Sequence, residues 1–340
     1  MNARRISPFN ARFFSPLLLI AGVLGWAPAF AAVTCVSTPL QLAIALFVAQ
    51  NNGEDDFIQL EVGTYNLGGE LDYFAATSET YALAINGGWA PGCNVRATSG
   101  SSVLDGQNAV RPLYIDANGN VSIFGLTFAH GNPAQYAGGA LNVTGPAGAV
   151  VAIDYNSFVA NSVPATNSGG AIFVSSPGTI LMRNNLFYAN QGTNTLYLVN
   201  DGIADLNNNT IVGNQLANHV GLGALDLAGS GTYYISNNLL WNNEGNDLYD
   251  QSGAANFSNN DIGVRDGFPP ASESNALSVD PQFGLLSVHP GLKSRLINAG
   301  LDTPYGGIGS EDLAFGERLI GKHVDIGAYE SEVLFANGFQ

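Results

Sequence analysis

The sequence predicts a right-handed parallel β-helix, a solenoid in which short strands stack coil upon coil, and two recurring patterns indicate it. A six-residue pattern with Asn at both ends and an apolar residue at its third position recurs at intervals of 24 or 29 residues. Its clearest copies begin at Asn156, Asn185, Asn209 and Asn238. A second pattern, Gly-Gly-Ala followed by Leu or Ile, begins at Gly138 and Gly169 and alternates with the first. Alternating repeats of this length are typical of solenoids.

The strands of each repeat are short, and their apolar residues fall at alternate positions. One coil cannot bury these residues by itself, but coils stacked about 4.8 Å apart place equivalent side chains above one another. Aligning the repeats predicts three columns that face the core. The first contains Val151, Ile180, Ala204, Tyr233 and Ala255, the second Ile153, Met182, Leu206, Ile235 and Phe257, and the third Phe158, Phe187, Ile211, Leu240 and Ile262.

The asparagines of the repeat predict two ladders at the turns between strands. Asn tolerates the left-handed backbone conformation, and its amide can bond to the Asn of the coils above and below. The first ladder would contain Asn156, Asn185, Asn209, Asn238 and Asn260, and the second Asn161, Asn190, Asn214 and Asn243. We therefore interpret these residues as scaffold and not as catalytic groups.

Both ends of the chain fit a capped solenoid. Apolar residues at helical spacing predict a helix whose apolar face closes the first coil. These residues are Leu40, Ala43, Ile44, Phe47 and Val48. The segment 57–60 reads as the first strand, with Gly63 at the turn that follows. Gly and Asn are abundant from end to end and no linker interrupts the middle, so the coils are expected to form one unit.

The first residues indicate export. Arg4, Arg5 and Arg12 precede an apolar stretch at 13–26, and Ala29 and Ala31 suit a signal peptidase. We expect a signal peptide at 1–31, an N-terminal cap at 32–56, β-helix coils at 57–266, C-terminal coils and a closing segment at 267–330, and a tail at 331–340. We expect no transmembrane segment after cleavage, and a monomer that is extracellular or at the outer-membrane surface, with the periplasm as the alternative.

The charge of the chain excludes several partners. The formal net charge is −16, and the predicted signal peptide carries three of the eleven basic residues and no acidic one. Nucleic acid and anionic membrane surfaces are therefore poor partners. Acidic polysaccharides would need bridging Ca²⁺, for which the sequence offers no motif, and we expect no other cofactor or metal.

Cys35 and Cys93 both follow the predicted cleavage point. In an oxidising compartment two such cysteines favour a disulfide that ties the cap to the first coils, and the alternative is a pair of free thiols.

Two family resemblances accompany these patterns. The alternation of Gly138 to Leu141 and Gly169 to Ile172 with Phe158 to Asn161 and Phe187 to Asn190 resembles the repeats of polymorphic outer-membrane proteins. Almost the whole mature chain resembles bacterial secreted β-helix proteins of the pectate-lyase-like superfamily. That likeness is carried by Asn86 to Trp89, Val103 to Gly106, Asp280 to Phe283, Leu296 to Gly300, Asp312 to Arg318 and Val324 to Glu330. The resemblance implies the fold and export, and it does not imply lyase activity.

Catalytic groups are hard to assemble from the repeats. A lyase of this fold needs an Arg or Lys base beside carboxylates that hold calcium. Arg183 is the one basic residue in the well-aligned repeats, and Asp154, one coil earlier in its column, predicts a surface ion pair instead. A glycoside hydrolase needs paired carboxylates, yet Asp205 and Asp226 fall on different strands. The histidines, His130, His219, His289 and His323, show no ligand spacing.

The outer face of the Gly-Gly-Ala strand is the most suggestive surface. If the Leu or Ile of this strand points inward, alternation places the next residue of each coil outward in one column. The column contains Asn142, Phe173, Tyr197, Asp226 and Tyr249. Three exposed aromatic rings with a carboxylate and an amide would suit a neutral glycan, or the strip could be covered by a loop. A second outward column, formed by Val159, Tyr188, Val212 and Trp241, carries the same alternatives.

From these patterns we expect a non-catalytic exported protein that binds a glycan or a cell-surface ligand along a lateral face of the β-helix. The alternatives are a polysaccharide-active enzyme, either a lyase or a glycoside hydrolase, and a structural envelope protein. A groove with several acidic residues and a base would favour the enzyme, and exposed aromatic rings without that cluster would favour binding.

Overall fold

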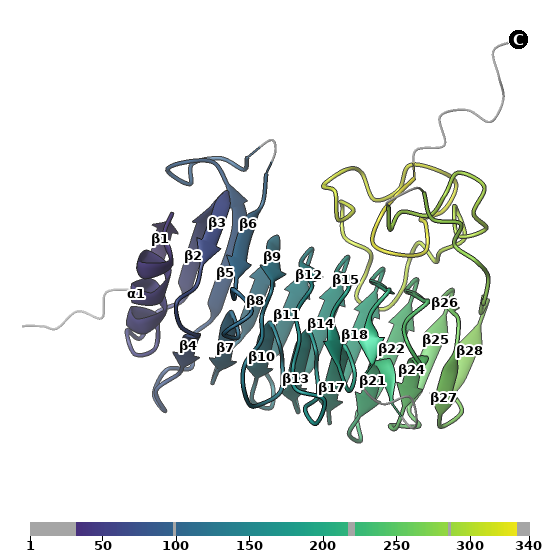
Figure 1. The fold of residues 1–340 in the computed structure, drawn as a ribbon, viewed down its shortest axis with the longest axis horizontal. Coiled ribbons are helices and arrows are strands. Elements are labelled where there is room, and N and C mark those ends of the chain that lie inside the picture. Colours follow the sequence, from purple (N-terminus) through teal and green to yellow (C-terminus); the bar gives the residue numbers. More distant parts are fainter. Residues whose placement is uncertain (1–31, 98–99, 217–221, 285–286, 332–340) are drawn as a thin grey trace, which may run out of the picture.

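The computed structural model describes residues 32–97, 100–216, 222–284 and 287–331. Its strands run in three parallel sheets that wind together as a right-handed β-helix, as the sequence predicts (Figure 1). The predicted signal peptide and residues 332–340 lie outside the described residues. No helix in the described part of the chain combines the length and the apolar character that a membrane crossing requires.

Each complete coil contributes one strand to each sheet in turn, and sheet A has one further strand at each end. Sheet A contains β1 (Ala32–Val36), β2 (Asp56–Glu61), β5 (Leu83–Trp89), β8 (Val121–Phe124), β11 (Val150–Asp154), β14 (Thr179–Arg183), β18 (Ile203–Asn207), β22 (Thr232–Ser236), β25 (Ala255–Ser258) and β28 (Ser272–Ser274). Sheet B contains β3 (Gly63–Asn66), β6 (Ser102–Asp105), β9 (Leu126–Ala129), β12 (Ser157–Val159), β15 (Leu186–Tyr188), β19 (Thr210–Val212), β23 (Leu239–Trp241) and β26 (Asp261–Ile262). Sheet C contains β4 (Leu71–Phe74), β7 (Leu113–Asp116), β10 (Leu141–Thr144), β13 (Ile172–Ser176), β17 (Leu196–Asn200), β21 (Gly223–Ala228), β24 (Asn246–Asp250) and β27 (Arg265–Gly267). Two short strands, β16 (Gln191–Gly192) and β20 (Gln215–Leu216), pair beside these sheets.

The three predicted inward columns are confirmed. Each column pairs residue with residue between successive coils, and all of its members are buried. In the third column the ring centroids of Phe158 and Phe187 are 4.9 Å apart and nearly parallel. Phe128 of the preceding coil stacks on Phe158 at the same distance. Close stacking of like side chains is what excludes water from the interior of so narrow a coil.

Both predicted asparagine ladders are also present, but their backbone conformation differs from the expectation. Asn185 Nδ2 donates to Asn209 Oδ1, which also accepts from the Asn185 backbone N–H, and this pattern repeats along the first ladder. The residue with positive φ is the one before each ladder asparagine, for example Asn184 (φ 55°) and Asn208 (φ 55°). The left-handed residue makes the corner, and the next Asn, turned inward, satisfies the backbone groups that the corner frees.

The helix α1 (Pro39–Ala49) covers the open end of the first coil, but with a different face from the one predicted (Figure 1). Leu42, Ala45, Leu46 and Ala49 are buried. Of the residues predicted to close the coil, Leu40, Ile44, Phe47 and Val48 are exposed, and Ala43 is partly buried against the core. The helix is apolar on all sides, so its pattern cannot choose a face, and packing against the coil below decides the choice.

The disulfide predicted between Cys35 and Cys93 is present, with Cα atoms 5.7 Å apart. It joins β1 to the loop that follows β5. The bond therefore ties the N-terminal cap to the first coils, as the sequence suggested.

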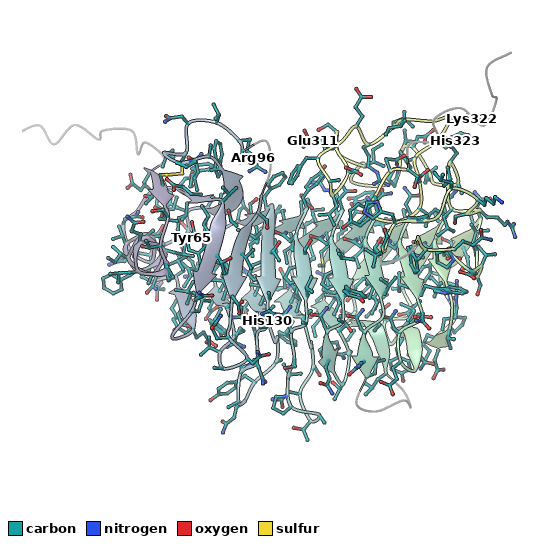
Figure 2. The ribbon with its side chains drawn as sticks, turned by 45° about the horizontal axis from the view of Figure 1, so that its top comes forward. Tyr65, Arg96, His130, Glu311, Lys322 and His323 are labelled. Carbon is teal, nitrogen blue, oxygen red and sulfur yellow. A yellow bond between two sulfur atoms is a disulfide. The ribbon has the colours of Figure 1, made fainter. Side chains whose placement is uncertain are left out.

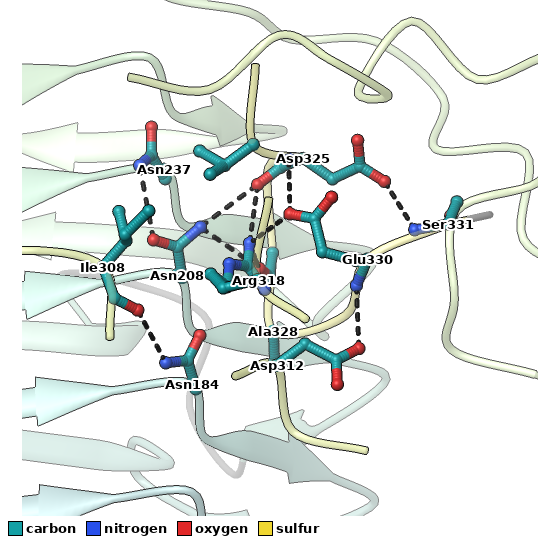
Figure 3. A network of polar contacts seen from close by, with 12 residues as sticks. Asn184, Asn208, Asn237, Ile308, Asp312, Arg318, Asp325, Ala328, Glu330 and Ser331 are labelled. Carbon is teal, nitrogen blue, oxygen red and sulfur yellow. Dashed lines mark hydrogen bonds and ion pairs between the residues drawn. The ribbon is translucent and has the colours of Figure 1, made fainter. Parts of the chain in front are cut away.

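The closing segment, residues 287–331, returns along the corner between sheets A and B, where the left-handed asparagines hold it (Figure 3). Asn184 Nδ2 donates to Ile308 O at 3.1 Å, and Asn208 Nδ2 donates to Asp325 O at 3.1 Å. Within the segment the buried Arg318 donates to Asp325 O and lies 3.3 Å from Glu330 Oε1. At this corner each pair of consecutive asparagines thus has two roles: the first residue binds the closing segment outside, and the second forms the first ladder inside.

Candidate binding face

The outward column predicted on sheet C exists in the predicted register. Asn142 pairs with Phe173, Phe173 with Tyr197, Tyr197 with Asp226, and Asp226 with Tyr249. The residue before each of them is buried in the core. Strand alternation therefore turns this column toward the outer face of sheet C.

The exposure expected for the two polar members of the column is wrong. Asn142 and Asp226 are buried. Asn142 Nδ2 donates to Ala137 O, in the loop before β10. Asp226 accepts from Asn194 Nδ2 at 3.2 Å and from Gln251 Nε2 at 2.6 Å. Burial raises the pKa of Asp226 to about 6, although both of these bonds oppose that shift.

The three aromatic members remain partly accessible. Phe173, Tyr197 and Tyr249 are half-buried, and the centroids of Phe173 and Tyr197 are 5.6 Å apart. Burial, and to a lesser degree Asp226, raises the pKa of Tyr197, so this phenol stays neutral at physiological pH. The face therefore presents partly exposed aromatic rings and a neutral hydroxyl.

The same column continues toward the N-terminal end, beyond the residues that the repeats aligned. Tyr114 of β7 pairs with Asn142, and Asp72 of β4 pairs with Tyr114. Phe74, at the end of β4, is half exposed, and its ring centroid lies 5.0 Å from that of Tyr114. The aromatic character of the face thus extends over the first coils.

A pocket of about 460 Å³ opens at this N-terminal end of the column. It is lined by Glu70, Phe74, Arg111, Tyr114, Tyr136, Ala137 and Asn142. Arg111 is almost fully buried, and its guanidinium lies 5.0 Å from the Tyr114 ring centroid. Arg111 Nη2 is 2.9 Å from Glu70 Oε1, and Nη1 donates to Ala137 O. These bonds fix one wall of the pocket, whereas Tyr136, 70% exposed, stands at its rim.

A carboxyl group with a perturbed pKa lies next to this pocket. Burial, followed by the neighbouring Glu70 carboxylate, raises the pKa of Asp72 to about 6, against the opposing effect of Arg111. Asp72 Oδ1 is buried without a hydrogen-bond partner among the described residues. A carboxyl in this state can exchange a proton near neutral pH.

Sequence reasoning missed this end of the face because the repeat is weakest there. Among the described residues the first ladder begins at Asn156, so Tyr114 and Asp72 lack the asparagine pattern that set the register. The alternation of Leu113, Tyr114 and Ile115 was the available signal. No local pattern, however, links Arg111 to Glu70, because 41 residues separate them.

The second outward column, on sheet B, is in the predicted register but is largely covered. Val159 pairs with Tyr188, Tyr188 with Val212, and Val212 with Trp241. Val212 is buried against Leu296 and Ile326 of the closing segment, and Trp241 packs on the same cluster. The alternative of a covered strip therefore holds for most of this column, although Tyr188 remains exposed.

The candidate catalytic groups do not assemble into a site. Arg183 forms an ion pair with Asp154, with Nη2 and Oδ2 2.6 Å apart, and also donates to Gly306 O of the closing segment, so the pair is partly covered. Asp205 lies on sheet A and Asp226 on sheet C. His219 lies outside the described residues.

The remaining histidines have separate surroundings. His130 lies 3.1 Å from Asp105, His323 lies 2.9 Å from Asp302, and His289 stacks on Tyr329. Within the described ranges, one group of metal-ligand residues comes together, Cys35, Glu61 and Cys93. Both of its sulfurs are already joined in the disulfide, so this group offers no thiolate ligand.

Comparison with known proteins shows only a distant structural likeness. No family model matches the chain, and no curated protein matches it. Among solved structures, the chain is similar to one described as the crystal structure of pectate lyase Pel9A, with 12% sequence identity and a TM-score of 0.34. The match covers 89% of this chain and 97% of that one. At this level of similarity the likeness carries no argument about fold or activity, and the parallel β-helix rests on the strand pairing described above.

Proposed function

We propose that this chain is an exported, non-catalytic β-helix protein that binds a neutral glycan, free or on a cell surface, along the outer face of sheet C. The observation that carries the proposal is the row of aromatic rings on that face, formed by Phe74, Tyr114, Phe173, Tyr197 and Tyr249. The faces of aromatic rings stack on the apolar side of sugar rings, and half-buried phenols offer neutral hydrogen-bond groups.

The rigidity of the scaffold supports the same proposal. Neighbouring coils lie about 5 Å apart, roughly the length of one sugar ring, so a chain along the solenoid axis could meet rings on adjacent coils such as Phe173 and Tyr197. The buried Asn142 and Asp226 each leave one coil without a ring in this row. Because the sheet fixes their positions, binding would order few side chains and lose little entropy. The strongly negative charge of the chain is compatible with a neutral ligand more than with an acidic polysaccharide.

Export belongs to the proposal as well. The basic and apolar pattern of residues 1–31 supports cleavage after Ala31, and the disulfide Cys35–Cys93 is compatible with an oxidising compartment. The resemblance of the repeats to polymorphic outer-membrane proteins supports a location at the cell surface. N-terminal sequencing of the exported protein would test the cleavage point directly.

The test is a glycan array probed with the purified mature protein, followed by titration of the best ligand. Replacing Tyr114 or Tyr197 with Ala should lower the affinity for that ligand about tenfold, because each substitution removes a stacking surface that contributes about 1 kcal/mol or more to binding. Tyr188→Ala is the matched control, since Tyr188 is exposed on sheet B, and it should bind as the parent does. Equal affinity in all three variants would place the binding face elsewhere.

A second candidate function, polysaccharide cleavage, is favoured by one observation, the pair Asp72 and Glu70 beside the pocket. A carboxyl with a pKa of about 6 can donate a proton near neutral pH, as the general acid of glycoside hydrolysis does. A panel of polysaccharide substrates, assayed with the parent and with Asp72→Asn, separates the two functions. Turnover by the parent that disappears in Asp72→Asn would establish the enzyme, whereas binding by the parent without turnover of any substrate supports the non-catalytic role.

A further inference from the structure

A second pocket lies away from sheet C, where the loop after β5 faces the closing segment. Its volume is about 570 Å³, within the range of small-molecule sites. It is lined by Gly88, Arg96, Ala97, Gly100, Phe124, Glu311, Ala314 and Phe315. Figure 2 places Arg96 on the N-terminal side of this opening and Glu311 on the edge of the closing segment that faces it. More than two hundred residues of chain separate the two walls, and only the tertiary fold brings them together.

The position of the Arg96 guanidinium is fixed by its surroundings. Its carbon lies 5.0 Å from the ring centroid of Phe124 and 5.3 Å from that of Phe315. Nη1 donates to Gly87 O at 2.5 Å. Gly125 has a φ of 67°, and a Cβ at this position would lie 3.1 Å from Nη2, so glycine there leaves room for the guanidinium. Aromatic rings cover the faces of this cation, and among the described residues Nη1 is the guanidinium nitrogen with a hydrogen-bond acceptor.

Arg96 and the nearby Glu311 carry opposite charges but do not form an ion pair with each other. Burial lowers its pKa, and Glu311 acts on it in the opposite direction through space. Within the described ranges, Arg96 and Glu311 do not approach closely enough to form an ion pair with each other. Glu311 itself is exposed. The pocket therefore holds a cation and an anion on its two walls, with apolar surface from Phe124, Ala314 and Phe315 between them.

We propose that this pocket binds a small zwitterion with an apolar body, of the kind represented by an aromatic α-amino acid. Its carboxylate would accept hydrogen bonds from Arg96, and its ammonium group would face Glu311. A simple anion would be repelled by Glu311 and a simple cation by Arg96, whereas a zwitterion complements both walls. The apolar body would lie against Phe124 and Phe315.

Calorimetric titration with three probes tests this proposal on the folded protein. L-phenylalanine carries both charges, N-acetyl-L-phenylalanine keeps the carboxylate alone, and L-phenylalanine amide keeps the ammonium alone. We expect L-phenylalanine to bind at least tenfold more tightly than either derivative, because each blocked form leaves one charged wall unpaired. Equal affinities for the three probes, or no saturable binding of L-phenylalanine at millimolar concentration, would overturn the proposal.

Two variants test which residue binds which charged group of the ligand. Arg96→Gln should lose the preference for L-phenylalanine over its amide, and Glu311→Gln should lose the preference over the N-acetyl derivative. Lys293→Gln and Glu317→Gln are the matched controls, because both residues are exposed on the closing segment outside the pocket, and both should bind as the parent does. If Arg96→Gln fails to fold, the probes with Glu311→Gln still decide the outcome. Unchanged probe preferences in Glu311→Gln would contradict the assignment.

Discussion

At the scale of single residues, the buried carboxyl groups are the least expected feature of this chain. Asp205 is completely buried beneath Gly306 of the closing segment. Its Oδ2 accepts from Asn207 Nδ2, and its Oδ1 has no partner among the described residues. Burial raises the pKa of Asp205 to about 7, although Arg183 and Asn207 oppose the shift. A carboxyl that is protonated at mild pH avoids the cost of burying an unpaired charge.

This perturbed group predicts how stability depends on pH. The folded state holds the Asp205 proton more tightly than the unfolded chain, in which Asp titrates near 3.8. The free energy of unfolding contributed by Asp205 is therefore full below about pH 4 and is lost as pH rises through about 7. We expect Asp205→Asn, which mimics the protonated form, to be more stable than the parent at pH 8 by on the order of 2–4 kcal/mol.

Denaturant unfolding at pH 4 and pH 8 measures this difference. Between these values the parent should lose more stability than Asp205→Asn does. Asp266→Asn, at an exposed position of β27, is the control and should keep the dependence of the parent. A pH dependence that is the same in Asp205→Asn and in the parent would show that Asp205 is ionised in the folded protein.

At the scale of elements, the helix α1 shows that a sequence pattern can identify a helix without determining which face of it is buried. Thr38 caps the helix, since its Oγ1 accepts from the Gln41 backbone N–H, and Pro39 follows at the first turn. These signals fix where α1 begins. Its buried face, by contrast, follows from contact with the first coil.

The rotation of α1 predicts a clear contrast between two substitutions. Leu46→Ala should lower the free energy of unfolding by about 2–5 kcal/mol, because Leu46 is buried against the first coil and its removal leaves a cavity. Leu40→Ala should change it by less than about 0.5 kcal/mol, because Leu40 is 70% exposed. Denaturant unfolding of both variants measures which face of α1 is buried. A larger loss of unfolding free energy for Leu40→Ala would show that the face predicted from the spacing is the buried one.

The asparagine pairs at the corners of the coils likewise have roles that the sequence pattern does not determine. Asn184 and Asn185 are adjacent and chemically identical, yet one binds Ile308 O of the closing segment and the other forms the ladder. The left-handed conformation of Asn184 turns the two side chains in different directions. The sequence shows that both are corner residues, and only the backbone conformation assigns their roles.

At the scale of the whole molecule, stability is shared between neighbouring coils and two devices that act over long distances. In a solenoid each coil contacts only its neighbours, so a substitution in one coil should change the stability of that coil and the adjacent ones. The disulfide joins residues 58 apart at the N-terminal end, which the chain-entropy model values at about 4 kcal/mol. The closing segment, in contrast, spans several coils at the C-terminal end, from Asn184 to Asn259.

This arrangement predicts that reduction of the disulfide loosens one end only. Amide hydrogen exchange after mild reduction should show faster exchange in β1, α1 and β2, because the disulfide ties this cap to the loop after β5. Amides of β14, β18 and β22 should keep their protection, since the closing segment and the ladders hold those coils. Cys35→Ser/Cys93→Ser is the control and should behave as the reduced parent. Uniform loss of protection along the solenoid would show that the coils unfold together.

The sequence by itself determined the coil, because the period of the repeat fixes which residues stack. From that period follow the three core columns, both ladders and the register of Asn142 through Tyr249 on sheet C. Adjacent coils repeat the same short-range geometry, so local pattern and global fold agree. The disulfide was also predicted from the sequence, because both cysteines follow the predicted cleavage point and an oxidising compartment was expected.

The tertiary structure alone decided which residues on the surface of the coil are exposed and which of them meet in a pocket. The burial of Asn142 and Asp226 depends on bonds from neighbouring loops, and the covering of the sheet B column depends on the path of the closing segment. The pairing of Arg111 with Glu70, and the meeting of Arg96 with Glu311 in one pocket, join residues that no period relates. A repeat specifies contacts between equivalent positions, whereas loops and the closing segment break that equivalence, and the candidate sites lie where they do so.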